Sequence, residues 1–176
     1  MMGRLRAMRE PLKYVQGRDA LLKFHEEMGY MGKRWLFVCS NSGYKACHDK
    51  IEKSFEGLDD YRRYEVFGGI SSNGEINKMK AIVEQDNIDT VVAVGGGSAV
   101  DTAKATAYYS GKHIVIVPTV AATDAPCTGL SVIYNDDHSF DKYLFYPTNP
   151  DAVMVDTTVI ANAPVKYCSC PENVRL

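Results

Sequence analysis

The sequence predicts an α/β domain built on a parallel β-sheet, and three observations support this prediction. Short apolar runs rich in β-branched residues recur along the chain, and several of them end at glycine or proline. Segments with apolar residues three or four positions apart lie between these runs. Strands that alternate with helices at this spacing are joined by crossover helices, so they lie parallel in one sheet.

Five runs have the composition of buried strands. The strongest is rich in β-branched residues and is closed by three glycines, and another is closed by Pro118. The predicted strands are residues 35–39, 64–67, 88–94, 113–117 and 152–155.

Helical spacing gives two further elements, at residues 19–28 and 75–85. The apolar residues that share a face are Leu21, Leu22, Phe24 and Met28 in the first helix, and Ile76, Met79, Ile82 and Val83 in the second. A third helix opens at Ala99, and His48 is expected to lie on a helix as well. Thr157 is expected to cap a short helix before Pro164.

A polar stretch at residues 135–139 separates two apolar runs, 130–134 and 143–146. Turn-forming residues between two strand-like runs predict a β-hairpin.

The composition excludes several functions. With 20 Lys and Arg against 22 Asp and Glu, the net charge is −2, which gives no general electrostatic attraction to nucleic acid or to anionic lipid. The longest apolar runs are far too short to cross a bilayer, and the basic start lacks an apolar signal core. The expected protein is cytoplasmic, with five cysteines as free thiols; Cys168 and Cys170 lack the second ligand pair that a zinc site needs.

The most informative stretch is the glycine-rich turn Gly95-Gly96-Gly97-Ser98, which lies between a strand and a helix. Three glycines allow a turn with positive φ and let backbone N–H groups approach an oxyanion. Ser98 is the expected N-cap, with Asp101 completing a capping box, and the helix start would cradle a pyrophosphate. A turn that merely caps a helix is the alternative, because Val100 stands where the dinucleotide fingerprint has its third glycine.

The loop after the strand at 113–117 is the second candidate site, because ligands of parallel sheets bind at the carboxyl ends of strands. Thr119 and Thr123 offer hydroxyl groups, and Asp124 offers a carboxylate. Asp124 would orient a substrate hydroxyl, or it would be a turn residue that binds nearby backbone N–H groups.

These stretches closely resemble the glycerol dehydrogenases of the iron-containing (group III) alcohol dehydrogenase superfamily. The residues that carry the resemblance are 95–105, 119–126 and 130–134, extended by 13–17, 149–151, 155–157 and 163–165. The resemblance implies a Rossmann-like N-terminal domain. It also implies NAD-linked oxidation of a secondary alcohol, such as the small polyol glycerol, to a ketone.

By this resemblance, Gly96, Gly97 and the following helix start with Ser98 and Asp101 hold the NAD pyrophosphate. The nicotinamide and ribose part of the cleft would be lined by Thr119, Ala122, Thr128, Leu130 and Tyr134, and Asp124 would contact the polyol. Two positions depart from the family. Ser98 stands where a lysine is frequent. Ser40, the cofactor-binding residue expected at the end of the first strand, is neutral where the family has an acid, which weakens the inferred preference for NAD over NADP.

The end of the sequence departs further. The family continues into a Gly-x-Gly-Asp segment and then into a helical second domain. The aspartate of that segment and two histidines of the second domain bind zinc or another divalent metal. After Tyr167 the last residues do not match. The expected organisation is therefore an NAD-binding domain at 1–167 and an unrelated tail at 168–176, without the family's metal ligands. None of the histidines (His25, His48, His113 and His138) matches a ligand position.

Three functions remain open on this sequence: a dehydrogenase, a catalytically inactive truncated or frameshifted dinucleotide-binding fragment, or a non-enzymatic interaction module. The chain could form a homo-oligomer. Neither nucleic acid nor a membrane is an expected partner.

Overall fold

The computed structural model describes residues 10–164, and the predicted tail at 168–176 lies outside them. Six strands form one sheet in the order β1-β8-β5-β4-β2-β3, and every neighbouring pair is parallel. The strands are β1 (Lys13–Gly17), β2 (Arg34–Cys39), β3 (Tyr61–Val66), β4 (Thr90–Gly95), β5 (His113–Pro118) and β8 (Ala152–Asp156). The predicted parallel α/β fold is confirmed, and the carboxyl ends of all six strands lie at one edge of the sheet.

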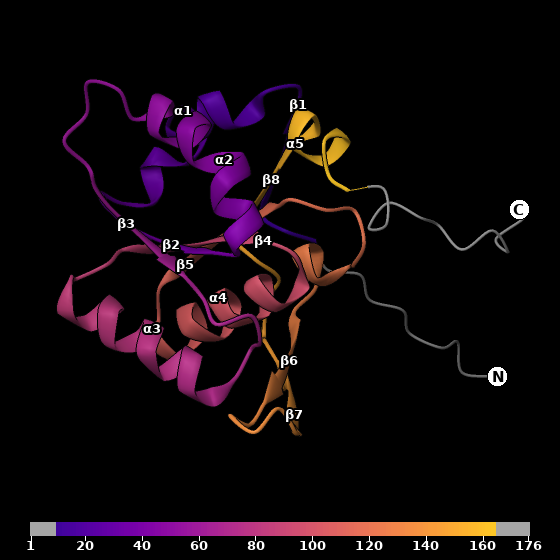
Figure 1. Ribbon diagram of the computed structural model, residues 1–176. Coiled ribbons are helices and arrows are strands. Elements are labelled where there is room, and N and C mark those ends of the chain that lie inside the picture. Colours follow the sequence, from indigo (N-terminus) through magenta and orange to yellow (C-terminus); the bar gives the residue numbers. More distant parts are fainter. Residues whose placement is uncertain (1–9, 165–176) are drawn as a thin grey trace, which may run out of the picture.

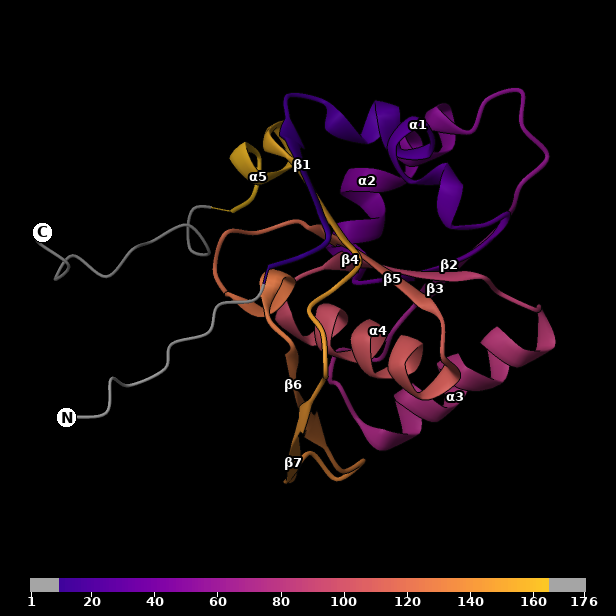
Figure 2. The same cartoon turned by 180° about the vertical axis from the view of Figure 1, so that it is seen from behind.

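Helices cover both faces of this sheet (Figures 1 and 2). One face carries α1 (Phe24–Met28), α2 (Asn41–Ser54) and α5 (Thr157–Ala161), and the other carries α3 (Asn73–Gln85) and α4 (Gly97–Ser110). Three 3-10 turns complete the fold: η1 (Ala20–Lys23), η2 (Gly29–Met31) and η3 (Ala125–Cys127). A parallel sheet needs helices on both sides because its strands are apolar on both faces.

The strand β2 shows how the two cores are divided. Trp35 and Phe37 pack with α1 and α2, whereas Leu36 and Val38 pack with α3 and α4. All four side chains are fully buried. Successive residues of a strand point to opposite faces, so one apolar run supplies both cores.

The predicted hairpin is confirmed as β6 (Leu130–Tyr134) paired antiparallel with β7 (Phe140–Phe145), separate from the main sheet. It projects from the side of the sheet that α3 and α4 cover (Figure 1). The side chains of Phe140, Tyr143 and Phe145 on β7 are more than half exposed.

The helix predicted at residues 19–28 is wrong as a single element, because η1 and α1 divide it. Leu21 and Phe24 are fully buried, but Leu22, which was expected on the same face, is 41% exposed. A 3-10 turn aligns residues three apart, so Leu21 and Phe24 share a face that Leu22 does not.

The helix predicted at residues 75–85 is confirmed as α3, and its four expected apolar residues are all buried. It begins two residues earlier than expected, because Ser72 is its N-cap. The hydroxyl of Ser72 accepts a hydrogen bond from the N–H of Glu75 at 3.2 Å.

The predicted cap of the last helix is wrong. Thr157 is the first residue of α5, and the N-cap is Asp156, whose carboxylate accepts hydrogen bonds from the N–H groups of Thr158 at 3.0 Å and Val159 at 3.2 Å. A carboxylate at this position also interacts favourably with the helix dipole.

Two elements are missing from the sequence prediction, namely β1 and most of α2. β1 alternates half-buried and exposed residues at the edge of the sheet, so it has no apolar run. α2 does contain His48, as expected, but it buries only Gly43, Cys47 and Ile51 among its fourteen residues. Such a narrow buried face gives a weak periodic signal.

No helix within residues 10–164 is long and apolar enough to cross a membrane. Cys39 and Cys47 are buried free thiols and Cys127 is an exposed one, whereas Cys168 and Cys170 lie outside the described part of the chain. Burial raises the pKa of the Cys39 and Cys47 thiols to about 12, so both stay protonated and unreactive near neutral pH.

Candidate functional site

Three cavities adjoin at the carboxyl edge of the sheet, and Val120 lines all of them. The first has a volume of about 230 Å³ and lies where β2, β4 and β5 end. Its lining includes five of the predicted cofactor residues, Ser40, Gly96, Gly97, Ser98 and Thr119.

The start of α4 faces this first cavity. Gly96 is the N-cap, with extended backbone, so the predicted cap at Ser98 is wrong, and no side chain caps the helix. The first backbone hydrogen bond of the helix runs from the N–H of Val100 to the carbonyl of Gly96 at 3.1 Å. The N–H groups of Gly97, Ser98 and Ala99 therefore have no acceptor within residues 10–164 and are available to an anion.

The three glycines of the turn differ in what requires them. A Cβ on Gly95 would lie 2.8 Å from the Cβ of Ala99, so packing demands glycine there. A Cβ on Gly96 or Gly97 would meet no atom closer than 3.5 Å. None of the three adopts the positive φ that glycine allows. Gly96 and Gly97 instead leave open the space that a pyrophosphate needs to approach the backbone.

Asp101 does not complete the predicted capping box. It is the fifth residue of α4, is 9% exposed and lines none of the three cavities. Its Oδ2 accepts a hydrogen bond from the N–H of Val132 at 3.3 Å, and its Oδ1 lies 3.3 Å from Nζ of Lys104. Burial raises the pKa of Asp101. The side chain therefore joins α4 to the hairpin.

Ser40 and Thr119 flank the glycine turn from the neighbouring strands. The Ser40 hydroxyl caps α2 by accepting a hydrogen bond from the N–H of Gly43 at 3.0 Å. Thr119 is buried, and its N–H donates to the carbonyl of Gly95 at 3.1 Å. Two helix N-termini, those of α2 and α4, thus border one cavity.

Asp124 lies in the second cavity, which has a volume of about 450 Å³ and lies between the loop after β5 and the strands β1 and β8. Its side chain is exposed and caps no backbone group of η3. The turn bond expected of Asp124 is made by Thr123, whose hydroxyl accepts from the N–H of Ala125 at 3.2 Å. The Asp124 carboxylate is therefore available to a ligand.

Four other predicted residues line none of these cavities. Ala122 is exposed in the same loop. The carbonyl oxygens of Thr128 and Leu130 accept hydrogen bonds from Lys104. Tyr134 ends β6, and its N–H donates to the carbonyl of Ser71, next to the start of α3.

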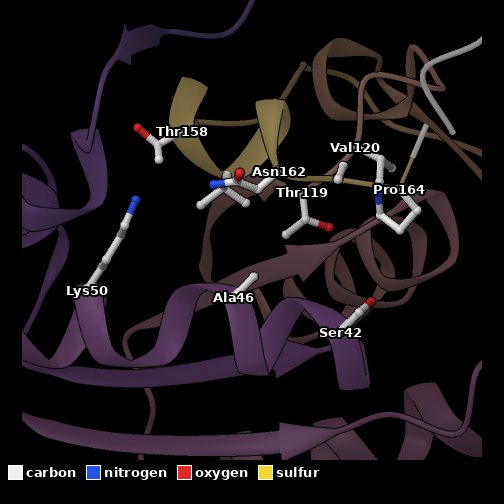
Figure 3. A pocket seen from close by; sticks show the side chains of 10 residues that line it. Ser42, Ala46, Lys50, Thr119, Val120, Thr158, Asn162 and Pro164 are labelled. Carbon is white, nitrogen blue, oxygen red and sulfur yellow. The ribbon is translucent and has the colours of Figure 1, made fainter.

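The third cavity has a volume of about 500 Å³ and contains a lysine that the sequence prediction missed (Figure 3). Lys50 and Thr158 lie at one end, and Ser42 and Pro164 at the other. Nζ of Lys50 lies 2.9 Å from Oδ1 of Asp19 and 3.0 Å from Oδ2 of Asp156, which is fully buried.

Burial alone would lower the pKa of Lys50, but hydrogen bonds to the two carboxylates outweigh it and raise that pKa. Lys50 is therefore a paired cation and not a free one. Its partners lie 31 and 106 residues away in the chain, so no local pattern could have identified it.

A metal site is not formed by the described residues, since no group of three His, Cys, Asp or Glu side chains within residues 10–164 is placed to hold an ion. His138 lies in the hairpin turn with a φ of 70°. The other histidines each contact one aspartate: His25 with Asp60, His48 with Asp49, and His113 with Asp151. This donor set does not fit a catalytic metal, which takes about three protein ligands.

The chain is similar to curated glycerol dehydrogenases over most of its length. The glycerol dehydrogenase of Escherichia coli O6:H1 is 39% identical over 161 residues, which cover 92% of this chain and 44% of that protein. The glycerol dehydrogenase of Thermotoga maritima is 41% identical over 164 residues, covering 89% and 43%. The chain thus spans less than half the length of these curated relatives.

The crystal structure of a probable glycerol dehydrogenase from Sinorhizobium meliloti 1021 matches with a TM-score of 0.82 and 36% identity, covering 93% of this chain and 44% of that one. The family model of iron-containing alcohol dehydrogenases matches residues 11–157. The chain belongs to the iron-containing alcohol dehydrogenase family.

Proposed function

We propose that this chain supplies the NAD-binding domain of a polyol dehydrogenase. One observation carries the proposal: Gly96 and Gly97 stand where packing does not require glycine, at the start of a helix whose first N–H groups have no protein acceptor within the described residues. A dinucleotide pyrophosphate explains both features, because it needs a close approach to the backbone and a set of free donors.

In this proposal the N–H groups of Gly97, Ser98 and Ala99 donate to pyrophosphate oxygens, and the dipole of α4 stabilises their charge. Ser40 borders the adenosine ribose and Thr119 borders the nicotinamide half. NAD, when bound, supplies the acceptor for a hydride. The described residues do not fit a catalytic metal, so no step through one is assigned to them.

Asp124 is the proposed contact for the substrate. Its exposed carboxylate lines the cavity next to the cofactor cavity, and Val120 borders both. A carboxylate accepts hydrogen bonds from hydroxyl groups, which suits a small polyol. The relatives named above are glycerol dehydrogenases, and glycerol is therefore the first substrate to test.

Calorimetric titration of the purified chain with NADH tests the cofactor assignment. The expected affinity is weak, with a Kd above about 1 μM, because Ser98 and Ser40 give neither a cation for the phosphates nor an acid for the ribose. Gly97→Val should weaken binding at least about tenfold by filling the space beside the backbone. Gly17→Val, at the end of β1 with open space around it, is the matched control and should leave binding unchanged. Sub-micromolar binding that Gly97→Val does not alter would overturn the proposal.

A second function, as an interaction module, is favoured by the exposed aromatic side chains of β7. Phe140, Tyr143 and Phe145 are 52%, 58% and 71% exposed, and the ring centroids of Phe140 and Tyr143 lie 5.0 Å apart. Exposed apolar patches mark association sites. Self-association is the expected behaviour, measured by light scattering across a concentration series. Phe145→Ser should lower it, and a concentration-independent monomer would count against this function.

A further inference from the structure

Lys104 on α4 is a buried lysine that the proposed function does not use. It is 3% exposed, although lysine is almost never fully buried unless it is paired. Its Nζ donates to the carbonyl oxygens of Ala125 at 2.9 Å and Thr128 at 3.3 Å, and also to that of Leu130. The ammonium group thus gathers three main-chain oxygens that lie within six residues of one another.

The charge of Lys104 is balanced locally. Oδ1 of Asp101, one helical turn earlier on α4, lies 3.3 Å from Nζ. Burial lowers the pKa of Lys104, whereas Asp101 and, more weakly, Asp124 favour the charged form. An ammonium has three donors, and the three carbonyls with one carboxylate are enough to occupy them all.

The segment that Lys104 holds has few other attachments. Within residues 123–130, the N–H of Ala125 is bonded to Thr123 and the N–H of Cys127 to the carbonyl of Asp124, so both contacts are internal to the segment. Two hydrogen bonds reach it from the segment after β7: the Asn149 side chain donates to the carbonyl of Cys127 at 2.8 Å, and the N–H of Tyr146 donates to the carbonyl of Gly129 at 2.9 Å. Leu130 also pairs with Phe145 in the hairpin. Lys104 therefore provides the largest group of bonds between this segment and the helix beneath it.

We propose that Lys104 is a positioning residue that fixes residues 123–130, and with them Asp124, at the nicotinamide and substrate side of the cleft. The inference rests on the proposed function, because that function gives Asp124 its role. Lysine suits this positioning role because one flexible side chain on α4 can direct three donors at three carbonyl oxygens of the segment. The side chain reaches them from the helix, so it does not enter the cleft.

Hydrogen exchange of the free chain is the first test. In Lys104→Met, the amides of residues 123–130 should exchange at least about tenfold faster, while those of β4 and β5 keep their protection. Lys104→Gln keeps two amide donors without the charge and should be intermediate; it also serves if the methionine variant fails to fold. Lys78→Met, on the exposed side of α3, is the control. Unchanged exchange at 123–130 in both Lys104 variants would overturn the proposal.

The second test separates the two halves of the cofactor. Lys104→Met should weaken NADH about tenfold and leave ADP-ribose, which lacks the nicotinamide, unchanged, because Gly96 and Gly97 hold the shared pyrophosphate. Equal weakening of both ligands, or of neither, would show that Lys104 does not position this side of the cleft. If the unaltered chain binds neither ligand, the proposed function fails, and the hydrogen exchange still decides whether Lys104 fixes the segment.

Discussion

The turn after β4 and the loop after β5 border one cavity together but are held in different ways. The turn is fixed by its immediate neighbours, because Gly95 packs against Ala99 with no room for a side chain. The loop is exposed from Ala121 to Asp124 and is held from beneath by Lys104, some twenty residues earlier in the chain. A binding cleft thus combines one side specified by local sequence with another that depends on a distant buried charge.

The largest expected loss of stability comes from a substitution in the turn after β4. Gly95→Ala should lower the free energy of unfolding by about 2 kcal/mol, because the new Cβ would overlap the side chain of Ala99. Gly97→Ala adds the same methyl group two residues later, where its nearest neighbour is Thr123 at an ordinary contact distance of 3.7 Å, and should change stability by less than about 0.5 kcal/mol. Urea denaturation of the two variants measures the difference, and equal losses would show that the turn is not packed as described.

A smaller effect distinguishes the two helix N-termini at the cleft. Ser40→Ala removes the side-chain cap of α2 and should cost about 1 kcal/mol of stability. Ser98→Ala should be nearly neutral, because α4 has no side-chain cap. Thermal or urea unfolding of both variants checks this. A loss at Ser98 that equals the loss at Ser40 would restore the capping role that the sequence predicts for Ser98.

The smallest effect concerns the loop and depends on pH. The pKa of Lys104 is lowered in the folded chain, so between that pKa and the unfolded value of 10.5 the unfolded chain binds more protons. The contribution of Lys104 to the free energy of unfolding should therefore rise as pH increases through this window. Lys104→Met lacks this titration. The free energy of unfolding of the unaltered chain minus that of Lys104→Met, from urea denaturation at several pH values, should therefore rise through this window. A fall in that difference with rising pH would contradict the assignment.

Most of the fold could be predicted because its signals are local. The β-branched runs of β4 and β5 and the periodic apolar face of α3 are legible over a few residues, and the structure has them nearly where they were expected. β1 escaped because an edge strand with alternating exposure has no apolar run. The division of residues 19–28 escaped because 3-10 and α spacing differ by less than one residue per turn.

The candidate site also has residues that local sequence predicted and residues that it did not. Gly96, Gly97, Ser40 and Thr119 follow strand ends, so the sequence alone placed them together at one edge of the sheet. The burial of Asp101 escaped prediction because its partner Val132 lies 31 residues away.

The sequence by itself determined the parallel sheet, the strand ends and the glycine-rich turn, since each depends on residues close together in the chain. Only the tertiary structure decided which charges are buried and what they hold. Lys50 meets Asp156 across 106 residues, and Lys104 meets the carbonyl of Leu130 across 26. The physical reason is that a buried charge is tolerated only where distant groups converge to satisfy it, and that convergence exists only in the folded chain.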